Sequence, residues 1–154
     1  MTAASFSTPA PAIAQLIDRV RDWTDVTLVP HPDDAVAVRL GDTTIGILQK
    51  GGQLEVPMPQ PIRTVLVEEE FAAVANSRSD PDWVAAPVEQ AGDVEAAALL
   101  LRLSYLYRRV LRSSDHVAFR HIRVELAHYD LPETLTVIYE TMLTKRADPP
   151  MFPQ

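Results

Sequence analysis

The spacing of hydrophobic positions changes once in the first third of the chain. Apolar residues recur every three or four positions from Ile13 to Trp23, with charged residues between them, which predicts an amphipathic helix. The segments that follow, 26–29, 35–40, 43–48 and 54–57, are rich in β-branched and apolar residues and are separated by Asp-Asp, Gly-Asp and Gly-Gly pairs. Such pairs favour tight turns, so these segments predict an antiparallel β-meander.

Prolines mark the end of the meander. Pro57 and Pro59 cannot donate to a strand ladder, and Pro61 suits the first turn of a short helix over 62–69. The polar stretch from Asn76 to Asp82 predicts a loop. Segment 83–88 predicts a further strand, and Pro87 favours an edge position for it.

The second half of the sequence predicts helices. Segment 94–111, with Asp93 as its N-cap, is apolar almost all round and must therefore be covered on two sides. One side can lie on the sheet. Two short helices would cover the other, the first capped by Ser114 or Asp115, with apolar stripes at Phe119, Ile122, Leu126 and Tyr129 and at Leu135, Ile138, Tyr139 and Met142.

Together these elements predict an α+β fold. An antiparallel β-meander of four to five strands packs against the first helix and helix 94–111, and a C-terminal helical pair is added. We expect a flexible N-terminus over 1–12, the α+β domain over 13–112, a helical extension of the same domain over 113–146 and a flexible tail over 147–154. A length of 154 residues suits one domain.

Composition narrows the function classes. The net charge of −7 disfavours phosphate backbones and anionic membrane surfaces as partners. The late helices are nonetheless rich in arginine, and with Tyr105 and Tyr107 they leave a DNA- or RNA-binding face open as an alternative. The lack of cysteine excludes disulfides and thiolate chemistry and fits a cytoplasmic location. No apolar run is long enough to predict a membrane span, and no phosphate-binding glycine motif occurs.

Four short sequence motifs, taken in their order along the chain, resemble the luciferase-like domain family, which is found in small bacterial proteins and in the luciferase of bioluminescent fungi. The resemblance covers roughly Ile13 to Tyr107, and the layout is also similar to the YjbR-like fold. The motifs are Trp23 leading to Val29-Pro30-His31-Pro32; Arg39-Leu40-Gly41 with Ile45-Gly46; Gly52-Gln53-Leu54-Glu55-Val56-Pro57-Met58-Pro59; and Asp82-Trp83-Val84 with Leu100-Leu101-Arg102-Leu103-Ser104-Tyr105.

One departure from the family pattern bears on function. The resemblance implies two histidines, as His-x-His, in the strand after Ile45-Gly46, but these positions hold Ile47 and Gln49. His31 matches the Pro-His step of the family and is kept. The family's chemistry on an aromatic, oxygen-reactive substrate is therefore not expected to proceed here in the same way.

Two hypotheses of function follow. The one we favour is a non-catalytic binding or assembly module that forms a homodimer or binds a protein partner through its C-terminal helices, with no cofactor. The alternative is an enzyme or binder for a small aromatic ligand, with His31 as base and with pocket residues Arg39, Gln49, Glu55 and Trp83. A plain turn histidine between Pro30 and Pro32 is the simpler interpretation of His31, and the one we favour over a general base.

A metal site is a further candidate. His121, Glu125 and His128 fall on one face of the predicted helix, at spacings of four and three residues. A complete ligand set would need further carboxylates from facing helices, which the sequence does not offer. We therefore favour a solvated helix face with a His–Glu pair.

Overall fold

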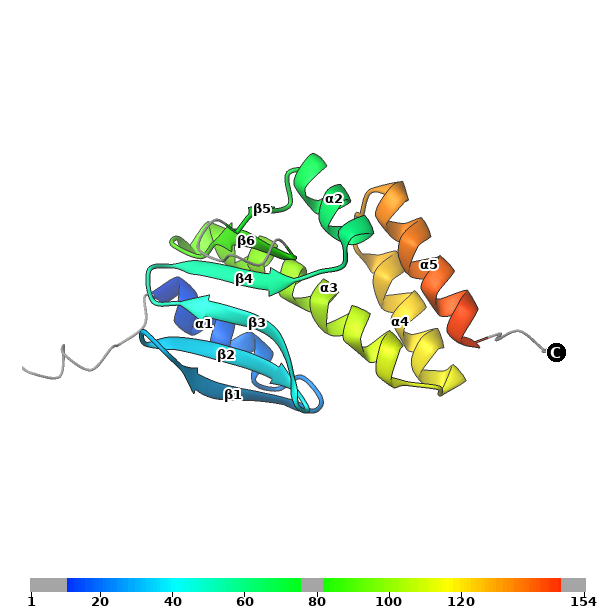
Figure 1. Ribbon diagram of the computed structural model, residues 1–154, viewed down its shortest axis with the longest axis horizontal. Coiled ribbons are helices and arrows are strands. Elements are labelled where there is room, and N and C mark those ends of the chain that lie inside the picture. The colour runs from blue at the N-terminus through cyan, green and yellow to red at the C-terminus, as the bar shows by residue number, and fades with distance from the viewer. Residues whose placement is uncertain (1–10, 76–81, 148–154) are drawn as a thin grey trace, which may run out of the picture.

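The computed structural model describes residues 11–75 and 82–147, which form an antiparallel sheet packed against helices (Figure 1). This confirms the predicted α+β class. In chain order the elements are α1 (Pro11–Val20), β1 (Val26–His31), β2 (Ala35–Leu40), β3 (Thr43–Gln49), β4 (Gln53–Pro57), α2 (Gln60–Glu68), β5 (Ala73–Val74), β6 (Trp83–Pro87), the short 3₁₀ turn η2 (Ala91–Asp93), α3 (Val94–Arg112), α4 (His116–His128) and α5 (Glu133–Ala147).

The sheet has the strand order β1-β2-β3-β4-β6-β5, and every pair is antiparallel. The predicted meander forms its first four strands. The prediction of an edge position for segment 83–88 was wrong, because β5 pairs with the outer side of β6. Pro87 is tolerated there because it is the last residue of β6, and β5 pairs only with Val84 and Ala85.

One face of the sheet is packed against α3, and α1 packs beside α3, behind the sheet in Figure 1. The core between these layers contains fully buried leucines from both sides, such as Leu48 on β3 and Leu101 on α3. Gly46 lets α3 approach closely, since a Cβ there would lie 2.6 Å from Leu101 Cδ1. The close packing of β3 against α3 thus explains the glycine in the Ile45-Gly46 motif.

The C-terminal helices complete the cover of α3, as the sequence predicted. Helix α5 packs against both α3 and α2, and its fully buried Tyr139 donates a hydrogen bond of 2.7 Å to the carbonyl oxygen of Leu103. Helix α4 contributes Phe119, Ile122 and Leu126 to the same core. Most of the apolar surface of α3 is therefore buried within one chain, although Leu111 in its last turn is 44% exposed.

The helix ends follow the predictions in one case and depart from them in another. Asp115 caps α4, since its carboxylate accepts a hydrogen bond of 2.9 Å from the backbone of Val117. Asp93 does not cap α3 through its side chain. Its carboxylate instead accepts hydrogen bonds from the backbone of Glu89 and Gln90, each 3.0 Å long, and so closes the 3₁₀ turn before the helix.

Some of the predicted segments lie outside the described residues. These are residues 1–10 of the expected N-terminal lead-in, residues 76–81 of the expected loop and residues 148–154 of the expected tail. Helix α1 begins at Pro11, and the side chain of Ala12 is buried. Among the described helices, none combines the length and the hydrophobicity that a bilayer crossing requires.

Candidate functional site

The sheet face opposite α1 and α3 carries a row of side chains in register. Ala37 on β2 lies opposite Ile47 on β3, Ile47 opposite Glu55 on β4, and Glu55 opposite Ala85 on β6. Successive side chains of a strand alternate between faces, so Gln49 and Gln53, two residues from Ile47 and Glu55, lie on this same face. Gln49 and Gln53 also pair directly.

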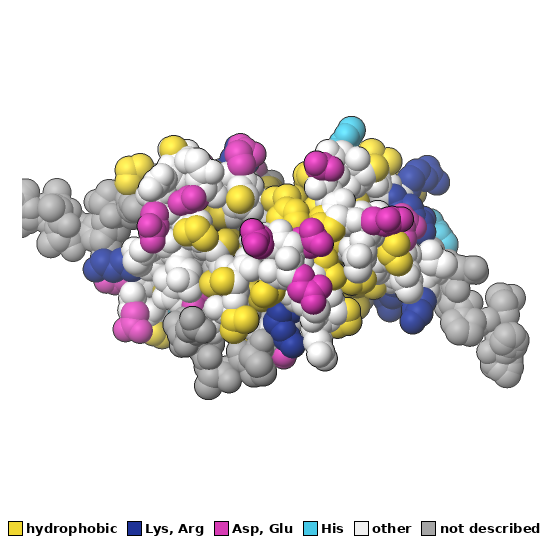
Figure 2. Space-filling model, turned by 90° about the horizontal axis from the view of Figure 1, so that it is seen from above, with side chains coloured by type: hydrophobic (Ala, Val, Ile, Leu, Met, Phe, Trp, Pro, Cys, Tyr) yellow, Lys and Arg dark blue, Asp and Glu magenta, His cyan; other side chains and the backbone are white. Residues whose placement is uncertain are grey.

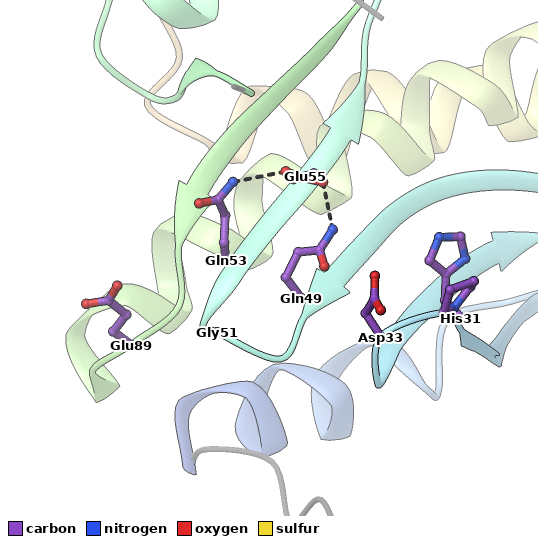
Figure 3. Close-up of a pocket in the computed structure, with 8 residues that line it drawn as sticks. His31, Asp33, Gln49, Gly51, Gln53, Glu55 and Glu89 are labelled. Atoms are coloured by element: carbon purple, nitrogen blue, oxygen red, sulfur yellow. Dashed lines mark hydrogen bonds between the residues drawn. The ribbon is translucent and has the colours of Figure 1, made fainter. Parts of the chain in front are cut away.

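A recess of about 480 Å³ opens at one end of this face (Figure 3). The turn between β1 and β2 and the turn between β3 and β4 lie at the same end of an antiparallel meander, which brings them together here. The lining residues are His31, Pro32, Asp33, Gln49, Gly51, Gln53, Glu55 and Glu89.

Glu55 lines the recess and is fully buried (0% exposed). Gln49 Nε2 donates a hydrogen bond of 2.9 Å to Glu55 Oε1, and Gln53 Nε2 donates one of 3.0 Å to Glu55 Oε2. Figure 3 shows the two amides approaching the carboxylate from the ends of β3 and β4. Each carboxylate oxygen is thus held by its own donor, which fixes Glu55 in one orientation and compensates part of the cost of burying it.

The chemistry of the recess is acidic. Its described lining contains three carboxylates, those of Asp33, Glu55 and Glu89, and neither lysine nor arginine. It also contains no serine, threonine or cysteine that could act as a nucleophile, and His31 is the only imidazole. Such a lining attracts cations and hydrogen-bond donors and offers no pair of nucleophile and base.

The structure brings together three of the five predicted pocket residues, His31, Gln49 and Glu55. Arg39 lies elsewhere on β2, where it donates a hydrogen bond to the carbonyl oxygen of Asp42. Trp83 lines a separate hollow, between β3, the end of β4 and α3.

Gln53 and Glu89 belong to the recess, but the sequence did not point to them. The Gly51-Gly52 turn could have indicated Gln53, because a tight hairpin there places residues 49 and 53 opposite each other. Glu89 follows β6 and reaches the recess only because β6 pairs with β4, a pairing without a local signal.

The candidate metal ligands are not brought together. Glu125 points to α3, where Arg102 Nε and Nη2 donate hydrogen bonds of 2.5 and 2.8 Å to its two oxygens, and Tyr129 also donates to it. His121 and His128 are exposed. Within residues 11–75 and 82–147, no three His, Asp or Glu side chains group in a way that could hold a metal ion.

Glu125 instead belongs to a part-buried ion-pair network between α3 and α4. Burial alone would raise the pKa of Glu125, but the hydrogen bonds from Arg102 and Tyr129 outweigh it and hold that pKa below its usual range. Burial and the hydrogen bond to Glu125 raise the pKa of Tyr129 to about 12.

The same packing bears on the alternative of a nucleic-acid face. Tyr105 is buried, donates its hydroxyl hydrogen to the carbonyl oxygen of Thr24 and lies against Trp23, so it is not free to stack on a base. Arg102 is held by Glu125, and Arg123 by Glu140 of α5.

Comparison with known proteins found no matching family model, no match among curated proteins and no match among solved structures.

Proposed function

We propose that this protein is a non-catalytic binding module of the luciferase-like type, and that its recess holds a small ligand with a positively charged group. The observation that carries the proposal is the fully buried Glu55 carboxylate, fixed by Gln49 and Gln53 in a recess that Asp33 and Glu89 also line. Because Glu55 is fully buried, its charge acts together with those of Asp33 and Glu89 in attracting an ammonium or guanidinium group into the recess.

The side chains of the recess favour binding over catalysis. The oxygens of Glu55 already accept hydrogen bonds from the side-chain amides of Gln49 and Gln53. The described lining supplies no nucleophile and a single imidazole, that of His31.

The family resemblance supports the choice of this face. Ile47 and Gln49 occupy the positions where the resemblance implies His-x-His, and both lie on the face that carries the recess. Ile47 places an apolar side chain opposite Glu55, and the side-chain amide of Gln49 donates a hydrogen bond to Glu55. An ancestral pocket that kept its shape and lost its imidazoles would have this arrangement.

The hypothesis of an aromatic ligand with His31 as base gains no support from this recess. Phenylalanine, tyrosine and tryptophan are missing from its described lining, and Arg39 and Trp83 lie outside it. For the compartment, we propose the cytoplasm, on the ground that the chain contains no cysteine.

A titration followed by NMR tests the ligand class. Putrescine and agmatine are added to the ¹⁵N-labelled protein while the side-chain NH₂ signals of Gln49 and Gln53 are observed, with acetate as the anionic counterpart. We expect saturable shifts of both amides with the amines and none with acetate. Glu55→Gln removes one charge from the recess and is expected to weaken amine binding about tenfold.

The matched control is Glu140→Gln, which removes an exposed carboxylate of α5 that pairs with Arg123 and does not line the recess. It lowers the net negative charge by the same amount and is expected to leave the amine affinity unchanged. Amide signals that do not respond to either amine, or equal weakening by both variants, would contradict the proposal.

A further inference from the structure

Charge is distributed unevenly along the length of the molecule. Residues 11–101, which contain the sheet and α1, carry six basic and fifteen acidic side chains, whereas residues 102–147 carry eight basic and five acidic ones. On the face drawn in Figure 2, most lysine and arginine side chains gather at the end that contains α4 and α5 in Figure 1. The protein is therefore acidic at the sheet end and basic at the helical end.

The outward face of α4 is both basic and apolar. Val117 and Val124, which are 50% and 55% exposed, lie one heptad apart with Arg120 between them. Arg120 forms no ion pair with the described part of the chain. The only carboxylates on α4 and at its cap are engaged, Glu125 by Arg102 and Asp115 by the helix backbone.

A surface of opposite character lies at the edge of the sheet. Val74 on β5 is 53% exposed and is the one large hydrophobic residue of the described sheet end that is exposed to this degree. It borders an apolar hollow of about 450 Å³ between the end of α2 and β6, lined by Val67, Glu70, Phe71, Ala72, Ala73, Val74, Ala85 and Pro87. The exposed carboxylates Glu68, Glu69 and Glu70 stand at the end of α2 beside this hollow.

We propose that the α4 face of one copy docks onto the β5–α2 hollow of a second copy, and that the contact is made twice in a two-fold dimer. The two surfaces match in charge, since Arg120 would face Glu68–Glu70, and in hydrophobicity, since Val117 and Val124 would cover Val74. A two-fold axis between the copies would place the basic α4 face of each copy beside the acidic end of α2 of the other. A two-fold dimer also closes, so it does not grow into fibres.

The oligomeric state as a function of salt is the first test. Sedimentation velocity and light scattering of the full chain are expected to show a dimer at low ionic strength. Raising the NaCl concentration to about 0.5 M is expected to weaken association about tenfold, because screening acts on the exposed charges that flank the contact. A monomer at every concentration up to about 0.3 mM, growth beyond a dimer, or insensitivity to salt would overturn the proposal.

A charge swap tests which surfaces meet. Arg120→Glu and Glu69→Arg, both at exposed positions, are each expected to weaken the homodimer about tenfold or more, since like charges then meet at both contacts. Mixing the two variants is expected to restore a dimer that contains one copy of each. Asp22→Arg on α1 changes the net charge as Glu69→Arg does and is expected to leave the dimer intact.

Failure of the mixture to restore a dimer, or equal weakening by Asp22→Arg, would show that these surfaces do not meet. Neither result would bear on the recess, because none of the three substituted residues lines it. The dimer and the proposed ligand binding can therefore fail independently.

Discussion

Arg102 and Glu125, twenty-three residues apart in the chain, form a two-point ion pair that joins α3 to α4. The guanidinium of Arg102 also lies 4.8 Å from the ring centre of Trp23 and 4.5 Å from that of Tyr105. One arginine thus connects α4, α3 and the segment after α1 through hydrogen bonds and cation–π contacts. This relationship explains why Glu125 faces inward while His121 and His128 on the same helix remain exposed.

Glu125→Gln is expected to lower the free energy of unfolding by about 2 kcal/mol at pH 7, because it leaves the part-buried Arg102 without a counter-charge. The pKa of Glu125 is lowered in the folded protein, so the carboxylate contributes stability above its unfolded pKa near 4.5 and loses it as the pH falls through the folded value. Urea denaturation of both proteins between pH 3 and pH 7 checks this. The difference in stability should shrink below about pH 4.

Glu140→Gln is the comparison for that experiment. Glu140 pairs with Arg123 at 3.1 Å, but both side chains are well exposed. We expect a loss below about 1 kcal/mol, since water screens this pair. If Glu125→Gln lowered the free energy of unfolding no more than Glu140→Gln does, the ion pair of Arg102 and Glu125 would not be what stabilises the packing of α4 on α3.

Gly46→Ala is expected to destabilise the protein by about 1–3 kcal/mol, because the new methyl group would press against the fully buried Leu101. The double variant Gly46→Ala with Leu101→Ala should recover part of the loss relative to the sum of the single changes, which thermal or urea unfolding would reveal. Strict additivity would mean that the close approach of β3 and α3 does not depend on Gly46.

Tyr139→Phe removes one hydroxyl group from a fully buried position on α5. The Leu103 carbonyl would lose its 2.7 Å side-chain hydrogen bond, and we expect a loss of about 1 kcal/mol in the free energy of unfolding. Tyr107→Phe, at a less buried position of α3, is the control and should cost less. Equal losses in the free energy of unfolding for the two variants would show that the hydrogen bond to Leu103 does not contribute to stability.

The elements that could be predicted are those with a strong local pattern. The apolar stripe that starts at Ile13 predicts α1, and the unbroken apolar run predicts α3. The pairs of turn-forming residues predict the hairpins of the meander. Strand β5 could not be predicted, because Ala73 and Val74 have no alternation to show and become a strand only by pairing with β6. That pairing also moved β6 from the edge to the interior of the sheet.

The candidate site was predictable only in part, for the same reason. His31, Gln49 and Glu55 could be assigned to one pocket by resemblance, and the antiparallel register does bring them together. Glu125 was misread, since its spacing from His121 and His128 favoured a solvated His–Glu pair and left a metal site open, whereas its partner is Arg102 on another helix. Side chains that meet through tertiary packing leave no periodic signal in the sequence.

Ile47→His would return one family imidazole to the recess face, directly opposite Glu55. Ile47 is 3% exposed, so losing its apolar side chain and burying an imidazole is expected to cost about 2 kcal/mol at pH 8.5. The carboxylate of Glu55 should raise the pKa of the new histidine. Its protonated form therefore adds stability below the unfolded pKa near 6.5 and loses it as the pH rises through the folded value.

The loss caused by Ile47→His should therefore shrink by about 1 kcal/mol between pH 8.5 and pH 5.5. Ile47→Asn, which is polar but does not titrate, should show the same loss at both pH values. Denaturation curves of the three proteins decide the matter, and the C2 proton signal of the new histidine gives its pKa directly. A pKa at or below the ordinary value would mean that the charge of Glu55 does not reach position 47, and that the recess could not have supported a His–Glu pair at this place.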